Sequence, residues 1–172
     1  DLADSQTPQG IVAVVQKEEV EQVDLNQGKF LFLEDVQDPG NVGTIIRTAD
    51  AAGFTGVIVS DKSADIYSLK TLRSMQGSHF HLPIYRMSSQ ALLKETKEEA
   101  IPVLATTLSE DSVDYRELPP IENFVLVMGN EGQGISHLMA ESADQLVHIS
   151  MKGQAESLNV AVAAGILIFH LS

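Results

Sequence analysis

Short apolar runs rich in β-branched residues alternate along this chain with segments whose apolar residues recur at helical spacing. The runs predicted to be buried strands are residues 11–15, 30–33, 57–60, 101–105, 124–128 and a short one from Leu146. The segments predicted to be helices are residues 42–52, 68–75, 89–100, 135–142 and 158–171. Nearly continuous apolar strands are typical of a parallel sheet with helices on both faces. The sequence therefore predicts an α/β fold whose ligands bind at the carboxyl ends of the strands.

The composition fits one soluble domain and excludes several classes of protein. A chain of 172 residues, 44% of them hydrophobic, is long enough for its own core. With 11 Lys plus Arg against 24 Asp plus Glu, the net charge of −13 argues against a simple basic nucleic-acid clamp. The absence of cysteine excludes disulfides, thiolate catalysis and Cys-based zinc sites. No apolar run reaches the ~18–20 residues of a membrane span and no signal peptide is recognisable, which predicts a cytoplasmic protein.

Residues 1–10 are predicted to be a linker, because Pro8, Gly10 and the other turn formers there leave little to bury. A chain that begins at Asp1, without an initiator Met, indicates a processed product or a piece of something longer. Residues 11–172 are expected to form the folded domain.

Residues 33–50 combine a strand end, a Pro39-Gly40 turn and the start of a helix. Asn41 is placed to cap that helix, whose free N–H groups are suited to an anion. Arg47 lies further along the same helix. Spacing alone favours a surface ion pair between Arg47 and Asp50 or another carboxylate.

Residues 127–136 carry three glycines and the carboxylate of Glu131 directly after a buried strand. Glycines in this position permit a tight turn or a close approach of the backbone to a ligand. The segment matches neither the Gly-x-Gly-x-x-Gly dinucleotide motif nor a P-loop, which makes NAD and ATP poor candidates. A ligand-binding loop and a purely structural turn both remain open.

A polar loop, residues 150–157, precedes a strongly apolar helix that Ser157 is placed to cap. Asn159 falls in the first turn, where its amide needs a partner that a ligand is able to supply. Elsewhere, His79 and His81 are expected on one face of a strand. Without a third ligand nearby, they favour ordinary packing over a metal site.

Three segments, taken in order, resemble the three motifs of the SpoU family of SPOUT RNA methyltransferases. These segments are residues 38–47, 128–136 and 149–160. The resemblance extends from about Phe30 to Leu171, and it implies S-adenosylmethionine as cofactor and a ribose 2′-hydroxyl of RNA as methyl acceptor. It also implies that the C-terminal part of the parallel sheet is threaded into a trefoil knot, an exception to the usual unknotted topology.

The resemblance also assigns roles to particular residues. The catalytic centre would be lined by Asn41, Arg47, Glu131, Ser157 and Asn159. The cofactor would be surrounded by Thr106, Gly129, Ile149, Ser157 and Leu158. Arg47 would hold an RNA phosphate with its guanidinium fork. A role as the base that accepts the ribose proton has less chemical support, because an ordinary guanidinium stays protonated.

The resemblance favours ribosomal RNA of the 23S type as substrate, because the terminal extensions of the transfer-RNA subgroup are not seen. Residues 7–11 resemble the junction that follows an N-terminal RNA-binding domain, which is expected to precede residue 1. A homodimer is expected, because active sites of the family lie beside a subunit interface, whereas neither a metal nor a membrane is expected to take part. The alternatives are a transfer-RNA 2′-O-methyltransferase and a non-catalytic knotted module that binds RNA or cofactor.

Overall fold

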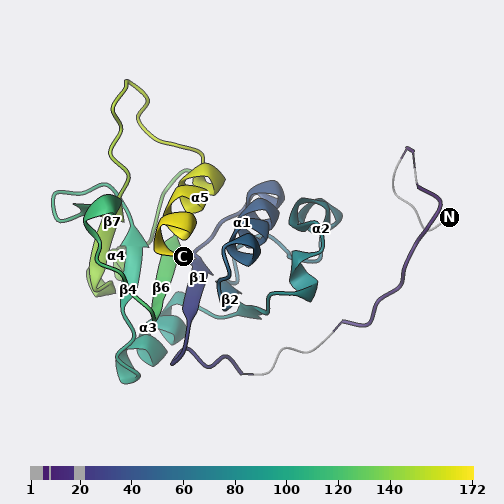
Figure 1. Ribbon diagram of the computed structural model, residues 1–172, viewed down its shortest axis with the longest axis horizontal. Helices are drawn as coiled ribbons and strands as arrows, with labels where there is room; N and C mark the ends of the chain where they lie inside the picture. Colours follow the sequence, from purple (N-terminus) through teal and green to yellow (C-terminus); the bar gives the residue numbers. More distant parts are fainter. Residues whose placement is uncertain (1–5, 8, 18–21) are drawn as a thin grey trace.

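The computed structural model describes residues 6–7, 9–17 and 22–172, and its main feature is a sheet of seven parallel strands (Figure 1). The strand order across the sheet is β3-β2-β1-β6-β4-β7-β5. The strands are β1 (Lys29–Leu33), β2 (Gly56–Val59), β3 (Ile84–Arg86), β4 (Val103–Thr106), β5 (Val113–Asp114), β6 (Phe124–Met128) and β7 (Gln145–His148). Leu31 lies in register with Val57 on one side and with Leu126 on the other, which places β1 between β2 and β6.

Helices cover both faces of this sheet. They are α1 (Pro39–Ala51), α2 (Leu69–Met75), α3 (Ser89–Glu98), α4 (His137–Ser142) and α5 (Val160–Leu171), with short 3-10 turns η1 (Ser78–Phe80) and η2 (Tyr115–Glu117). One core packs α1, α2 and α5 against strand residues such as Leu31 and Leu126. The other core packs α3 and α4 against residues that alternate with these, such as Phe32 and Val125. Because successive strand residues point to opposite faces, the two cores confirm the predicted α/β architecture.

The apolar run at residues 11–15 is not a strand, contrary to the prediction. Ile11 and Val14 are 88% and 90% exposed, and this segment extends away from the sheet (Figure 1). An apolar run forms a strand only where a neighbour completes its hydrogen bonds, and no described strand lies alongside this one. The sequence also does not predict β3 and β5. With three and two residues at the two sheet edges, these strands carry too little apolar pattern to be recognised.

The expectation that His79 and His81 share a strand face is also wrong. His79 lies within η1 and His81 directly follows it. The chain turns sharply after α2, because Gln76 and Gly77 both adopt left-handed backbone conformations, with φ of 52° and 85°. The turn continues as a 3-10 helix, in which side-chain directions do not repeat as they do on a strand.

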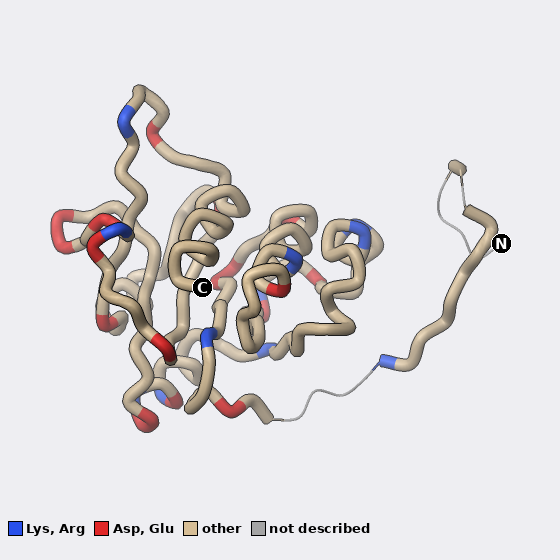
Figure 2. Tube along the Cα trace, viewed as in Figure 1, with Lys and Arg blue, Asp and Glu red and all other residues tan. Residues whose placement is uncertain are grey.

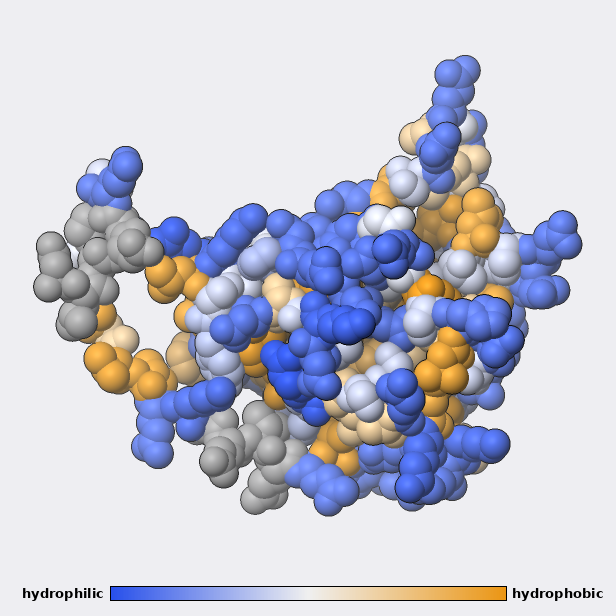
Figure 3. Space-filling model, turned by 180° about the vertical axis from the view of Figure 1, so that it is seen from behind, coloured by the Kyte–Doolittle hydropathy of each residue, from blue (hydrophilic) through white to orange (hydrophobic). Residues whose placement is uncertain are grey.

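The connection from β7 to α5 rises from the carboxyl ends of the strands and returns to a helix that packs beside α1 (Figure 1). Threading of this part through a trefoil knot stays a prediction. Seen from behind, the molecule is mostly hydrophilic, with separate smaller apolar areas (Figure 3). No helix in the described ranges is both long and apolar enough to cross a membrane.

Candidate active site

A cavity of about 780 Å³ opens at the carboxyl ends of β4, β6 and β7. All five residues predicted to surround the cofactor line it, namely Thr106, Gly129, Ile149, Ser157 and Leu158. Its apolar wall includes Val160 and Leu167 from α5. The hydroxyl of Thr106 donates to the carbonyl of Val127 at 2.9 Å and thereby ties β4 to β6 at the rim. The volume and the mixture of apolar walls with a few polar groups are typical of small-molecule sites.

The loop that follows β6 forms one side of the cavity and is organised by Asn130. Its Oδ1 accepts hydrogen bonds from the backbone N–H groups of Gly132 and Gln133, at 2.9 and 3.0 Å. Its Nδ2 donates to the carbonyl of Asp35 at 2.8 Å, which fixes the loop to the end of β1. A Cβ at Gly129 would lie 2.3 Å from the backbone nitrogen of Ile135. The loop therefore requires glycine at this position for steric reasons, in addition to any role toward a ligand.

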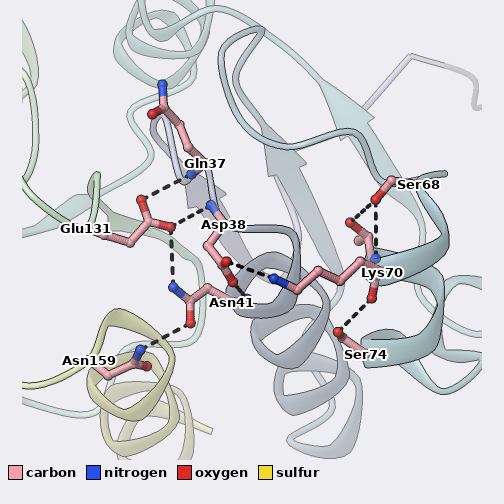
Figure 4. Close-up of polar contacts among 9 residues, drawn as sticks. Gln37, Asp38, Asn41, Ser68, Lys70, Ser74, Glu131 and Asn159 are labelled. Carbon is pink, nitrogen blue, oxygen red and sulfur yellow. Dashed lines mark hydrogen bonds and ion pairs between the residues drawn. The ribbon is translucent and has the colours of Figure 1, made fainter.

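Glu131 projects from this loop to the start of α1 (Figure 4). Its carboxylate accepts hydrogen bonds from the backbone N–H groups of Gln37 and Asp38, at 3.1 and 2.9 Å. Its Oε1 also accepts from the side-chain amide of Asn41 at 3.4 Å. The carboxylate thus joins two of the predicted motifs across the top of the sheet.

Asn41 is also hydrogen-bonded to Asn159. Asn159 Nδ2 donates to Asn41 Oδ1 at 3.2 Å, so Glu131, Asn41 and Asn159 form a continuous chain of hydrogen bonds (Figure 4). Three of the five predicted catalytic residues are therefore brought together. The partner that the Asn159 amide needs is another motif residue of this chain.

Both predicted helix caps are wrong by a few residues. Asp38, rather than Asn41, caps α1, and its Oδ2 accepts from the backbone N–H of Asn41 at 2.8 Å. Asn159, rather than Ser157, caps α5, and its Oδ1 accepts from the N–H groups of Ala161 and Val162. Ser157 lies before the helix, where it lines the cavity. The side chains of Asn41 and Ser157 therefore do not cap a helix.

Arg47 lies on the exposed side of α1, well past Asn41, and does not line the cavity. Asp50, its suggested ion-pair partner, is instead 3.4 Å from Nδ1 of His81. The Arg47 guanidinium forms no ion pair or side-chain hydrogen bond with any residue that the structure describes. The suggested pairing with Asp50 is therefore wrong, and the guanidinium is available to a ligand.

Glu34 is a site-supporting residue that sequence reasoning missed. Its side chain is only 3% exposed and directly follows β1. Its carboxylate accepts from the hydroxyls of Ser89 and Ser136, at 2.6 and 3.0 Å, and from the backbone N–H of Ser136. These bonds hold the starts of α3 and α4 and thereby the far end of the loop after β6. The available signal is an acidic residue directly after an apolar strand, because a carboxyl group buried at such a position needs hydrogen-bond partners.

The ionisation of Glu131 offers a test of the hydrogen-bond chain. Burial acts to raise its pKa, but the N–H groups of Asp38 and Gln37 and the amide of Asn41 outweigh this and hold the pKa below its ordinary value. Glu131 therefore stabilises the fold above its unfolded pKa of about 4.3, and this contribution is lost as the pH falls through the lowered folded value. We expect the free energy of unfolding, measured by urea titration, to fall more steeply below about pH 4.3 in the wild type than in Glu131→Gln. Parallel curves for the two proteins would contradict this account of the carboxylate.

Comparison with known proteins identifies close relatives. The SpoU rRNA Methylase family matches residues 28–169. Over 170 residues the chain is 45% identical to the 23S rRNA (guanosine(2553)-2'-O)-methyltransferase RlmP of Bacillus subtilis, covering 99% of this chain and 67% of that protein. An AdoMet-bound rRNA methyltransferase from Sinorhizobium meliloti superposes with a TM-score of 0.81 at 39% identity, covering 89% of this chain and 61% of that one.

A second solved relative is the SpoU methyltransferase AviRb from Streptomyces viridochromogenes in complex with the cofactor AdoMet. It superposes with a TM-score of 0.76 at 34% identity, covering 87% of this chain and 60% of that one. This chain therefore spans less than two thirds of either solved chain. The motifs, the parallel fold and these matches lead to one conclusion: the chain belongs to the SpoU rRNA methylase family.

Proposed function

We propose that this chain is the methyl-transferring domain of an S-adenosylmethionine-dependent RNA 2′-O-ribose methyltransferase that acts on ribosomal RNA in the cytoplasm. The observation that carries the proposal is the meeting of Thr106, Gly129, Ile149 and Leu158 around one cavity, next to the hydrogen-bond chain from Glu131. The names of the relatives support the same class of reaction.

The cavity fits the proposed cofactor. Ile149 and Leu158 give the cavity an apolar wall suited to a flat ring, and residues of the two flanking loops line its other sides. S-adenosylmethionine bound there would supply an electrophilic methyl group. Gly129, by lacking a side chain, lets the backbone of residues 134–135 pack against the end of β6 and so shapes this wall of the cavity.

Residues around the cavity are assigned the other steps of the reaction, which are to orient the ribose hydroxyl and to bind the RNA phosphate. A ribose hydroxyl is a weak nucleophile, and it must be oriented and deprotonated as the methyl group transfers. We assign the adjacent RNA phosphate to the free guanidinium of Arg47, whose fork matches phosphate oxygens. Ser157 and the Asn41–Asn159 pair hold the ribose, and Glu131 fixes the orientation of that pair.

Ribosomal RNA is the favoured substrate, and transfer RNA is the alternative. The relative from Bacillus subtilis named above acts on 23S rRNA, whereas another relative, 34% identical, carries the broader name putative TrmH family tRNA/rRNA methyltransferase. We expect the full-length protein to methylate an unmodified 23S rRNA transcript and to leave unmodified transfer RNA unchanged. Mapping of alkali-resistant ribose positions measures this. Methylation of neither RNA would support the non-catalytic alternative.

Cofactor binding is a separate prediction. We expect the chain to bind S-adenosylmethionine or its demethylated product without RNA, because the residues that line the cavity all lie within the described segments. Titration calorimetry measures the affinity. Absence of binding at millimolar ligand, by protein with a cooperative unfolding transition, would reject the site.

We also propose that the protein is a homodimer that pairs through α5. This helix leaves Val162 and Phe169 more than half exposed, at 53% and 56%, and Leu158 precedes it at 38%. Large apolar side chains gathered on one helix favour a protein partner. Light scattering at tens of micromolar should give the mass of two chains, and a monomer would contradict the proposed interface.

A further inference from the structure

A long segment beside α1 lacks acidic residues in an otherwise acidic protein. Residues 66–87 contain no Asp or Glu, whereas the whole chain has 24, and they hold three of its 11 Lys and Arg. The segment includes α2, η1 and β3. In Figure 2 the tube over α2 carries basic positions and no acidic ones. A local surface of this kind suits a polyanion even when the net charge of the protein is negative.

This segment lies directly against the side of α1 that carries Arg47. A Cβ at Gly43 would be 2.4 Å from the Cβ of Ser74, so α1 and α2 approach closely at that point. Asp50 contacts His81, directly after η1. Gly43, Arg47 and Asp50 follow one another at spacings of four and three residues and therefore share one side of the helix. Arg47 is exposed, so it lies at the solvent edge of the side that faces α2 and η1.

Phe80 is the most exposed aromatic residue of this surface. Its side chain is 64% exposed, and its ring lies 4.0 Å from that of His79 at a tilt of 37°. Burial, with a smaller effect from His81, lowers the pKa of His79 and thereby favours the neutral ring. The Phe80 ring also lies next to Gly77, whose position for a Cβ is 3.9 Å from Cδ2. A large apolar ring is therefore held at the surface by a neutral ring and a glycine turn.

Arg73 provides a free cation on the same surface. It is exposed in the last turn of α2, two residues before the helix ends, and its guanidinium has no partner among the described residues. Lys70, by contrast, is 3.2 Å from the carboxylate of Asp38. Arg73 is thus the cation of α2 that is available to a phosphate.

We infer that Phe80 is a stacking platform for a base of the bound RNA, and that Arg73 binds a backbone phosphate beside it. This inference rests on the proposed function and specifies how the substrate is held. Stacking on an aromatic face tolerates any base, whereas phosphate contacts set the position of the strand without reading its sequence. His81, beside Phe80, contacts Asp50 in the last turn of α1, so this surface lies toward the amino ends of the strands, whereas the cavity opens at their carboxyl ends. Phe80 and Arg73 therefore hold RNA outside the target nucleotide.

The test compares Phe80→Leu, Phe80→Trp and Arg73→Gln in the full-length protein, with Leu138→Ala as a control for loss of an exposed apolar residue on α4. Filter binding to an unmodified 23S rRNA transcript is measured across a salt series. We expect Phe80→Leu to bind about 5- to 100-fold more weakly with an unchanged salt slope, and Phe80→Trp to bind like the wild type. Arg73→Gln should reduce the slope of log K against log salt by about 0.7 to 0.9. Leu138→Ala should match the wild type.

Wild-type affinity in Phe80→Leu, or equal weakening by Leu and Trp, would overturn the stacking platform. The proposed function is judged separately from methyl transfer by the wild-type protein. A wild type that methylates RNA while Phe80→Leu keeps its KM shows that the platform is wrong and the function right. If the wild type binds RNA through Phe80 but transfers no methyl group, the stacking platform is right and the proposed methyl transfer is wrong.

Discussion

The Arg47→Ala variant is expected to lose methyl transfer to RNA by about 10²- to 10⁴-fold, the range typical of a removed positioning or proton-transfer group. The guanidinium is exposed, has no partner among the residues that the structure describes, and lies outside the cofactor cavity. Its removal therefore leaves the affinity for S-adenosylmethionine at the wild-type level. Single-turnover methyl transfer measures the first effect, and titration calorimetry the second.

Two further variants sharpen this experiment. Arg47→Lys should fail as well, because an ammonium keeps the charge without the fork that binds two phosphate oxygens. Lys94→Ala is the matched control, since Lys94 is an exposed cation on α3, paired only loosely with Glu98 at 4.0 Å, and α3 packs on the other face of the sheet. If Arg47→Ala kept most of its activity, the role assigned to the guanidinium would be wrong even though the family is right.

The Gly129→Ala variant is expected to lose cofactor binding and to unfold at a lower temperature. The added Cβ would lie 2.3 Å from the nitrogen of Ile135 and 2.4 Å from the carbonyl carbon of Gly134. Both are backbone atoms, so relief requires the whole loop after β6 to move. Overpacking of this kind costs about 1–3 kcal/mol. Thermal unfolding with and without S-adenosylmethionine measures both losses.

Gly132→Ala is the control for this change, because it alters the same loop without a clash. The nearest atom to its Cβ position is the side-chain oxygen of Asn130 at 3.7 Å, an ordinary contact. We expect its unfolding temperature to remain that of the wild type. Equal destabilisation by the two substitutions would mean that the loop is sensitive to any side chain, and the steric argument for Gly129 would fail.

The central part of the fold was predictable from the sequence because buried parallel strands leave apolar runs. β1, β2, β4 and β6 each coincide with such a run to within two residues. The edge strands β3 and β5 were not predictable, since they form only because a neighbour offers free hydrogen-bonding groups. The segment at residues 11–15 is the opposite case: an apolar run for which the described sheet offers no such neighbour.

The helix caps show where local patterns mislead. Asp38 was recognisable as the cap of α1, because Pro39 suits the first helical position and requires the cap directly before it. For α5, Ser157 and Asn159 are both good capping residues, and nothing local separates them. The side-chain amide of Asn159, which caps α5, also donates to Asn41, 118 residues earlier. This tertiary contact is not visible in the local sequence.

The three motifs predict which segments meet at the cavity, whereas the individual contacts between them were not predictable. Arg47 lies outside the cavity, and the hydrogen-bond chain joins side chains 90 and 118 residues apart. Contacts over such separations follow from the arrangement of strands, which no local spacing encodes. Glu34 was missed for the same reason, because its partner Ser136 is 102 residues away.

The strand order determines when β1 becomes paired on both edges during synthesis of the chain. β1 lies between β2 and β6, and Gly28, just before β1, donates a hydrogen bond to Asn123, 95 residues later. During synthesis β1 can pair with β2 early, but its other edge has no partner until β6 emerges from the ribosome. At typical elongation rates this interval is on the order of ten seconds. An open apolar strand edge is a site for mispairing, so this chain is exposed to aggregation while it is still attached to the ribosome.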